Sequence, residues 1–286
     1  MIEGVVPAIL TPFRGGTVDH GLLGEHMAWL AERGIRCVNA MGTTGEGLSL
    51  SVAERKALVE RVAAGPLDFI AGTGCTNLPE TIELSRHALE HGARAALVVP
   101  PTYYAVQDLP AWYTGLLEAL PGDGRIFLYH IPRLSHPISD ELIDELRGRF
   151  GPLVAGMKDS SGDLDHALEW RRRYPDLTVA SGDDALASGF FGAGGRAMIT
   201  AVSNVLPDEL QAIQRGESGA QPFVTAVKEL CLTVPREAAL KLLLHVVSGI
   251  PRAEVRSPLA ELTREQEHAV ARTFAELRSE SHVGSR

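Results

Sequence analysis

The sequence predicts an α/β protein folded as a (β/α)8 barrel, the TIM barrel, with a helical extension at its C-terminal end. First, eight short apolar runs alternate with amphipathic helical patterns over about the first two hundred residues. Second, none of these runs alternates between apolar and polar residues, which is typical of parallel strands covered by helices. Third, a length of 286 residues suits a single barrel. Eight strand–helix units favour a closed barrel over an open, doubly wound sheet.

The eight apolar runs are the expected strands, in the order Val5–Leu10, Cys37–Met41, Phe69–Gly72, Ala95–Val99, Ile126–Tyr129, Leu153–Met157, Leu177–Ala180 and Ala197–Thr200. Helix starts between them carry capping signals. Ser51 and Asn77 each precede a glutamate by three residues, as in a capping box, and Thr263 precedes Gln266 in the same way. Ser139 is a further expected cap after Pro137.

Beyond residue 205 the pattern is helical only. Four segments carry it, namely Leu210–Arg215, Phe223–Leu232, Glu237–Val247 and Glu265–Arg278. Pro235 separates the middle two, because proline ends or kinks a helix. No Pro/Gly/Ser-rich linker sets this region apart. We therefore expect one domain over residues 1–286, with the helical extension over about residues 217–286.

Composition excludes several classes of protein. The net charge is −9 with no sustained basic run, which argues against a nucleic-acid surface. No stretch reaches the 18 or more apolar residues of a membrane span, and the N-terminus lacks the pattern of a signal peptide. The three cysteines, Cys37, Cys75 and Cys231, are too widely separated for a disulfide framework. These features predict a soluble cytoplasmic protein.

The active site of such a barrel lies at the C-terminal ends of its strands. Lys158 follows the sixth apolar run there, where burial would lower the pKa of its amine and make it a nucleophile; alternatively it leaves the strand for solvent. Tyr129 ends the fifth run and is either a general acid or base or a core tyrosine. The turn from Gly42 through Thr43 and Thr44 is either a carboxylate cradle or an ordinary connection.

Together these segments resemble the dihydrodipicolinate synthase/N-acetylneuraminate lyase family of class I aldolases, over about residues 3–280. The matching stretches stand in the family's order: Pro7–Phe13, Gly42–Glu46, Ala71–Gly74, Tyr129–Pro132, Gly156–Asp159 and Ser181–Asp184. So many spaced motifs in register make a chance match very improbable.

The resemblance implies a role for each matching residue. Lys158 would form an imine with pyruvate or with the keto group of a longer 2-oxo acid, and Tyr129 would shuttle protons. Thr43 and Thr44 would hold the carboxylate and orient the tyrosine hydroxyl, and the backbone carbonyl of Ile199 would lie against the keto acid. No metal or other cofactor is expected, because the imine supplies the electrophile.

The family also implies a homo-oligomer, a dimer or a tetramer. The tyrosine that reaches a neighbouring subunit corresponds to Tyr103 or Tyr104.

His87 and His91 lie one helical turn apart, which is a metal-ligand spacing. With no HExxH pattern and no evident third ligand, we interpret them as surface histidines.

Departures from the family bear on the substrate. Leu134 stands where the synthases place an arginine on the aldehyde's carboxylate, and Arg133, one residue earlier, is expected to point elsewhere. Ala201 replaces a serine of the neuraminate lyase branch. The Lys158–Gly162 segment is similar to members that act on 2-keto-3-deoxy sugar acids or 4-hydroxy-2-oxoglutarate. The sequence therefore predicts a lyase that cleaves or dehydrates such an acid. Two alternatives stay open: a synthase condensing pyruvate with aspartate semialdehyde, and a non-catalytic 2-oxo acid sensor.

Overall fold

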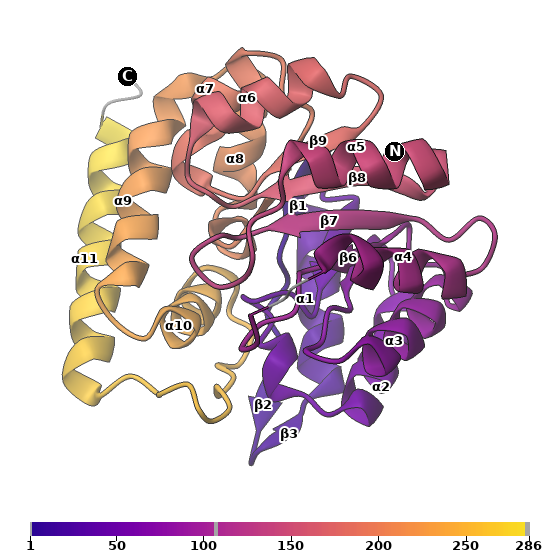
Figure 1. Cartoon of the computed structure of the whole chain (residues 1–286). Helices are drawn as coiled ribbons and strands as arrows, with labels where there is room; N and C mark the ends of the chain where they lie inside the picture. The colour runs from indigo at the N-terminus through magenta and orange to yellow at the C-terminus, as the bar shows by residue number, and fades with distance from the viewer. Residues whose placement is uncertain (1, 106–107, 284–286) are drawn as a thin grey trace.

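Eight parallel strands form the centre of the molecule (Figure 1). The computed structural model describes residues 2–105 and 108–283, so residues 1, 106–107 and 284–286 of the expected domain lie outside it. The strands are β1 (Gly4–Pro7), β4 (Cys37–Ala40), β5 (Asp68–Gly72), β6 (Ala96–Val98), β7 (Ile126–His130), β8 (Val154–Asp159), β9 (Thr178–Ser181) and β10 (Ala197–Thr200). Each lies on one of the eight predicted apolar runs.

The sheet curls on itself to make a barrel. Its strand order is β1-β10-β9-β8-β7-β6-β5-β4, with every pair parallel. The two ends meet at a parallel bridge between Ala8 and Asn39, where the Ile9 amide donates to the Asn39 carbonyl at 2.9 Å. The predicted (β/α)8 fold class is confirmed.

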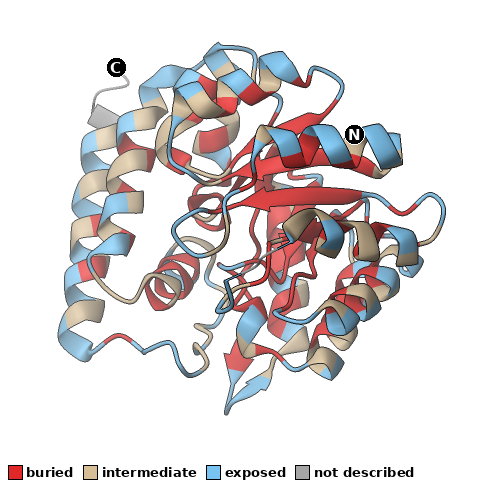
Figure 2. Ribbon diagram, in the orientation of Figure 1, coloured by how far each residue is buried: buried red, intermediate tan, exposed pale blue. Residues whose placement is uncertain are grey.

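Helices cover the outside of the barrel and alternate with the strands along the chain. They are α1 (His20–Glu32), α2 (Val52–Ala63), α3 (Leu78–Glu90), α4 (Leu109–Ala119), α5 (Asp140–Phe150), α6 (Leu164–Arg173), α7 (Ala187–Gly192) and α8 (Pro207–Gln214). Figure 2 shows buried strands inside and exposed outer helix faces. The predicted caps are confirmed: Ser51 forms a full capping box with Glu54, and Asn77 and Ser139 accept amide hydrogen bonds.

Three further helices form the predicted C-terminal extension: α9 (Gln221–Leu232), α10 (Arg236–Ser248) and α11 (Arg264–Val283). α9 and α11 run side by side (Figure 1), and Phe223 packs on Phe274 with ring centroids 6.1 Å apart. α10 is buried along much of its length, including Leu240 and Leu243. Within residues 2–105 and 108–283, no helix combines the length and the apolar character needed to cross a membrane.

A small hairpin after β1 was not predicted. It pairs β2 (Phe13–Arg14) with β3 (Thr17–Val18) across Gly15 and Gly16. Both glycines have positive φ, 55° and 74°, which a two-residue turn of type I′ requires. The Phe13 carbonyl accepts from the Glu254 amide at 2.9 Å, so the hairpin also ties the segment after α10 to the barrel.

Candidate active site

Lys158 and Tyr129 lie next to each other at the C-terminal ends of β8 and β7. They are partners in the strand register, and residues opposite each other in a sheet point to the same face. That face is the barrel interior, because Tyr129 packs with the interior residues Phe127 and Ile199 in one buried cluster. The Lys158 Nζ donates to the Tyr129 Oη at 3.4 Å, and each residue is only 5% exposed.

The environment favours proton transfer at Tyr129. Burial alone would raise the pKa of its hydroxyl, but the Lys158 charge and hydrogen bonds with Thr43, Ser160 and Lys158 outweigh burial, so the pKa is lowered. A phenol with a lowered pKa releases its proton more easily near neutral pH. The pair therefore combines an amine nucleophile with an adjacent acid–base group.

The turn after β4 carries the two threonines. Thr44 is buried and Thr43 exposed. The turn is pressed against the end of β1: a Cβ on Gly45 would lie 2.7 Å from the Ile9 carbonyl oxygen, and the Thr11 hydroxyl donates to the Gly45 carbonyl at 2.6 Å. Glycine is therefore required at position 45, and the turn holds the threonines in a fixed position.

Glu46 fastens this turn to the C-terminal extension. Its buried carboxylate pairs with the buried Lys241 of α10 and accepts the Arg256 amide at 2.9 Å. Lys241 also donates to the Glu254 carbonyl at 2.6 Å. Burial lowers the pKa of Lys241 even though Glu46 opposes this shift. Glu46 was part of a predicted motif, but sequence reasoning did not identify this structural role.

A cavity of about 180 Å³ opens at the mouth of the barrel. Six residues considered for the site from the sequence line it: Lys158, Tyr129, Thr43, Thr44, Ile199 and Arg133. The cavity places threonine hydroxyls, a tyrosine hydroxyl and an amine around one small volume. Such an arrangement can bind the carboxylate of a small oxo acid and present its carbonyl carbon to the amine.

Arg133 also lines the Lys158 cavity, so the expectation that its side chain points elsewhere was wrong. The reason is local geometry. The Ile131 carbonyl accepts from the amides of Leu134 and Ser135 at 2.9 and 3.1 Å, so the chain turns directly after β7 and the alternation of a strand no longer applies. Leu134 instead lines a second, largely apolar cavity together with Gly42, and this cavity shares Thr43, Tyr129 and Ile131 with the first.

The two candidate tyrosines of the neighbouring-subunit contact stand outside both cavities. Tyr103 is 93% exposed and Tyr104 is 64% exposed. Their rings pack edge to face at 5.2 Å, and Tyr103 has a positive φ of 78°. The Tyr104 carbonyl accepts from the His136 ring at 2.8 Å. Within one chain, the structure does not bring either ring to Lys158.

Other residues of the Lys158 cavity were missed by sequence reasoning. Lys228 of α9 pairs with Asp183 in its wall, and Arg236 of α10 lines it too. These two residues could be assigned to the cavity only from the packing of their helices on the barrel, and a local sequence pattern does not predict that packing. Gly182 leaves room for the site, because a Cβ there would lie 2.0 Å from the Ser160 hydroxyl. Burial raises the pKa of the neighbouring Asp184.

A second polar group lies behind Lys158, on the outward side of β7 and β8. His166 of α6 contacts Asp159 at 2.7 Å, and Asp159 also accepts from the Ser161 amide at 2.8 Å. His130 accepts from the Ile138 amide at 3.0 Å through its Nδ1. These residue types can bind a metal, but both Asp159 oxygens and one His130 nitrogen already have partners. The group holds the turn that follows Lys158.

Comparisons with known proteins agree with this geometry. Residues 1–277 match the model of the Dihydrodipicolinate synthetase family. A Chloroflexus aurantiacus protein described as an "uncharacterized DapA-like lyase" is 38% identical, over 95% of this chain and 96% of its own. A 4-hydroxy-tetrahydrodipicolinate synthase of Methanococcoides burtonii is 32% identical, over 97% and 99%. The crystal structure of KD(P)GA from T. tenax superposes with a TM-score of 0.90 at 25% identity, over 98% and 100%.

Proposed function

The chain belongs to the dihydrodipicolinate synthetase family, and we propose that it is a class I lyase in which Lys158 binds a 2-oxo acid as an imine. One observation carries this proposal. The buried Lys158 amine lies 3.4 Å from the Tyr129 hydroxyl at one small cavity, which the hydroxyl-bearing Thr43 and Thr44 also line. An amine, an acid–base group and carboxylate-binding hydroxyls are the groups that imine chemistry on a keto acid requires.

The reaction follows from these groups. The Lys158 amine adds to the keto carbon, Tyr129 supplies and removes protons, and water leaves to give the protonated imine. For cleavage, Tyr129 removes the proton of the C4 hydroxyl, the electron pair of the C3–C4 bond passes to the imine, and the C4 fragment leaves as an aldehyde. The remaining enamine is protonated at C3 and hydrolysed, which frees the Lys158 amine and releases the shorter oxo acid. Thr43 and Thr44 hold the carboxylate meanwhile. The protonated imine stabilises the developing charge, and we propose that no metal takes part.

For the substrate we propose a 2-keto-3-deoxy sugar acid or a 4-hydroxy-2-oxoglutarate-type acid, which is cleaved or dehydrated. Ser160, Ser161 and the Asp183–Lys228 pair line the cavity beside Lys158. The serine hydroxyls can donate hydrogen bonds to the hydroxyl groups of a sugar acid and accept bonds from them, and the Asp183 carboxylate can accept them. The similarity to KD(P)GA from T. tenax supports this choice.

A second candidate is condensation of pyruvate with aspartate semialdehyde. The observation in its favour is Arg133, which is exposed, lines the Lys158 cavity and has no ion-pair partner among the described residues. A guanidinium there could hold the carboxylate of the aldehyde. The 4-hydroxy-tetrahydrodipicolinate synthase of Methanococcoides burtonii supports this candidate.

We further propose that the protein is a cytoplasmic homotetramer. The exposed aromatic pair Tyr103 and Tyr104 supports an oligomer, since large aromatic side chains gather at interfaces. The cysteines Cys37, Cys75 and Cys231 are all free and buried, which is compatible with a reducing compartment.

Borohydride trapping tests the imine. Reduction in the presence of pyruvate should add a pyruvate-derived mass to the peptide that contains Lys158, and to no peptide of Lys158→Ala. Label on Lys228 or Lys241 instead would contradict the assignment. Turnover of 4-hydroxy-2-oxoglutarate or a 2-keto-3-deoxy acid should accompany trapping. A protein that is trapped but turns over none of these acids, nor pyruvate with aspartate semialdehyde, would instead be a 2-oxo acid sensor.

A further inference from the structure

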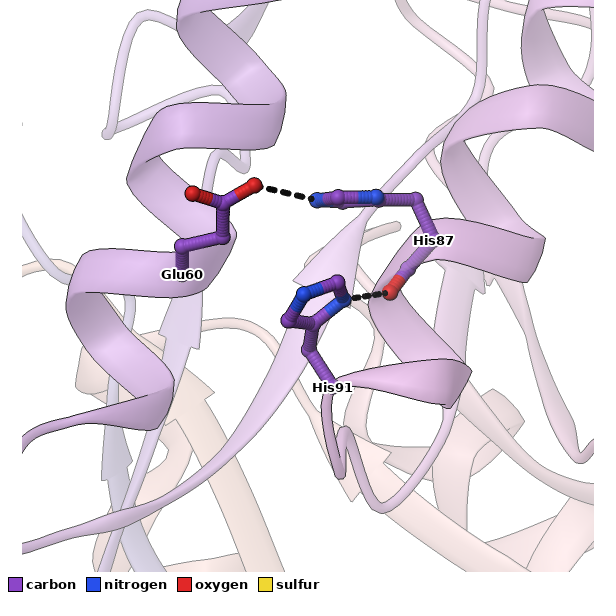
Figure 3. A group of neighbouring side chains, drawn as sticks. All are labelled: Glu60, His87 and His91. Carbon is purple, nitrogen blue, oxygen red and sulfur yellow. Dashed lines mark hydrogen bonds and ion pairs between the residues drawn. The ribbon is translucent and has the colours of Figure 1, made fainter.

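Two neighbouring outer helices bring three metal-binding side chains together. Glu60 comes from α2, His87 comes from the last turn of α3, and His91 is the residue that caps the C-terminal end of α3 (Figure 3). Each residue offers one ligand atom, and the three atoms all lie within 4.8 Å of one another. The sequence interpretation of the two histidines as surface residues rested on the lack of a third ligand. The structure supplies one, Glu60, from a different helix.

We propose that Glu60, His87 and His91 bind a divalent transition-metal ion of the Zn²⁺ type. Two imidazoles and one carboxylate are a common ligand set for Zn²⁺, with water in the fourth position. Mg²⁺ and Ca²⁺ prefer sites made of oxygen ligands alone, so the two histidines select against them. Ligands about 2.1 Å from a tetrahedral ion lie roughly 3.4 Å apart. The exposed Glu60 side chain can make the small movement that this needs.

His91 is already in the form that a metal ligand requires. Its Nδ1 lies 2.8 Å from the backbone carbonyl oxygen of His87. A carbonyl can only accept, so Nδ1 carries a hydrogen, and in the neutral ring the lone pair is therefore on Nε2. Metal-bound histidines are commonly oriented by such a bond from their second ring nitrogen. In Figure 3 the remaining nitrogen of His91 lies on the side of the ring nearer Glu60.

His87 has a nitrogen that the protein leaves unsatisfied. Its Nε2 is buried and has no hydrogen-bond partner among the described residues, although the Glu60 Oε1 lies 3.4 Å away. A buried polar atom without a partner costs free energy. An ion placed between the His87 Nε2 and the Glu60 carboxylate would satisfy the nitrogen and also use the carboxylate's charge.

The cluster lies far from the chemistry of the barrel mouth. Helices of a β/α barrel run antiparallel to its strands, so the C-terminal ends of α2 and α3 lie at the N-terminal end of the strands, opposite the active site. An ion there would clamp α2 to α3 without touching Lys158. This proposal therefore does not depend on the proposed lyase activity.

Calorimetric titration of the untagged protein with ZnCl₂ tests the site. We expect one saturable ion per chain, a melting temperature that rises with Zn²⁺ concentration, and no binding of Mg²⁺. His91→Ala and Glu60→Gln should each weaken binding by more than about 10-fold. Both residues are exposed, so both variants should fold. The matched control is His268→Gln, an exposed histidine of α11, which should bind Zn²⁺ as the wild type does.

Three results would overturn the site: no saturable binding, unchanged affinity in both His91→Ala and Glu60→Gln, or an equal loss in His268→Gln. Binding that persists in both cluster variants would place the ion elsewhere, for example at the His130, Asp159 and His166 group. Turnover should be the same with EDTA and with saturating Zn²⁺. A failure of Zn²⁺ to bind leaves borohydride trapping at Lys158 unaffected, so the two proposals fail separately.

Discussion

The hydroxyl of Tyr129 contacts only a few of the described residues, and all of these residues line the Lys158 cavity. The side chain is buried in the barrel interior, where its ring packs with Phe127 and Ile199. Its hydroxyl meets Lys158, Thr43 and Ser160. Removing the oxygen alone therefore disturbs the proposed chemistry more than the packing.

We expect Tyr129→Phe to fold normally and to lose about 10²–10⁴-fold in kcat, the usual effect of removing an acid–base group. Circular dichroism and the melting temperature check the fold, and steady-state kinetics check the rate. Borohydride trapping should slow as well, because imine formation needs proton transfer. Wild-type turnover in this variant would assign the proton transfer to another group.

The choice between the two candidate substrates depends on Arg133 and Leu134. Leu134 lines the second cavity and not the Lys158 cavity, whereas Arg133 lines the Lys158 cavity from a turn that strand geometry does not fix. A carboxylate that loses its charged partner loses roughly 1.5–3 kcal/mol, about one to two decades in rate. Arg133 stands one residue before the position of the family arginine, so we expect its guanidinium not to bind the aldehyde's carboxylate in the same way, and condensation to be slow.

We therefore expect kcat/KM for aspartate semialdehyde to be at least about 10-fold below that for cleavage of a 2-keto-3-deoxy or 4-hydroxy-2-oxo acid. The measurement compares these substrates in the wild type and in Arg133→Ala. An efficient wild-type synthase whose activity Arg133→Ala abolishes would show that Arg133 binds the carboxylate and that the synthase candidate is correct.

Among single residues, those at the ends of strands could be assigned to the site from the sequence. The strand period and the barrel rule place Lys158, Tyr129 and Thr43 at one mouth before any coordinates are known. The orientation of Arg133 was mispredicted, because it depends on a turn that the sequence does not mark. Lys228 and Arg236 were missed, because they reach the cavity through the packing of α9 and α10 on the barrel.

The elements are joined at the mouth by a buried ion pair between Glu46, in the turn after β4, and Lys241 on α10. Both side chains are almost completely buried, at 0% and 1% exposed. Removing one partner of such a pair leaves the other charge buried and unpaired, which costs about 3–5 kcal/mol. Neutralising both partners avoids that cost.

Lys241→Met should therefore lower the free energy of unfolding by about 3–5 kcal/mol, and adding Glu46→Gln should restore part of the loss. Urea denaturation of the wild type, both single variants and the double variant measures the coupling. Additive losses in the double variant would show that the pair contributes no coupling energy.

His26 on α1 makes the stability of the fold depend on pH. It is buried, and burial lowers its pKa from 6.5 to about 3, although a hydrogen bond to the Asn204 backbone opposes the shift. Between these two values the unfolded chain binds one proton more than the folded chain. The stability from His26 is therefore complete above pH 6.5 and is lost as the pH falls toward 3.

We expect the free energy of unfolding to fall by up to about 1.4 kcal/mol per pH unit below pH 6.5 because of this one residue. His26→Leu should flatten the slope between about pH 7 and pH 5, a range above most carboxylate pKa values. The exposed His268 gives a matched control, since His268→Gln should keep the wild-type slope. An unchanged slope in His26→Leu would exclude His26 as the cause.

Local signals predicted most elements and missed one. The capped starts of α2, α3 and α5 were predicted because a cap is encoded within four residues. The hairpin of β2 and β3 also carries a local signal, the Gly15–Gly16 pair, which was not read as a turn. Its role depends on the contact between Phe13 and Glu254, residues that are far apart in sequence.

For the whole molecule, the number of strand–helix units predicted the closed barrel correctly. The closing contact itself, between Ala8 and Asn39, carries no local signal, because β1 and β4 are separated by a hairpin and α1. The exposure of some surface side chains likewise depends on whether another chain binds there. Large apolar side chains are exposed in the loops after β4, β6 and β7, at Leu48, Tyr103, Tyr104 and Leu134. They follow strand ends, so they lie toward the same end of the barrel as the mouth.

A single chain that exposes such a group of side chains is expected to cover it with another chain. Tyr103 is 93% exposed and adopts a positive φ, a conformation that costs free energy for a residue other than glycine. A contact with a neighbouring copy would bury the ring and offset that cost. Because the family resemblance implies a homo-oligomer, we expect this neighbour to be a second copy of the chain.

We therefore expect sedimentation velocity to show a homo-oligomer, with a tetramer at micromolar concentration. A double change of Tyr103→Ser and Tyr104→Ser should shift the distribution toward smaller species and lower turnover at the same time, because the site would lose a residue that the neighbour supplies. Val246→Ser, an exposed apolar residue of α10 that lines neither the Lys158 cavity nor the Leu134 cavity, is the control and should leave the mass unchanged. A wild-type monomer with full turnover would contradict both the assembly and the role of the tyrosines. An intact oligomer with reduced turnover in the double variant would keep the catalytic role and place the interface elsewhere.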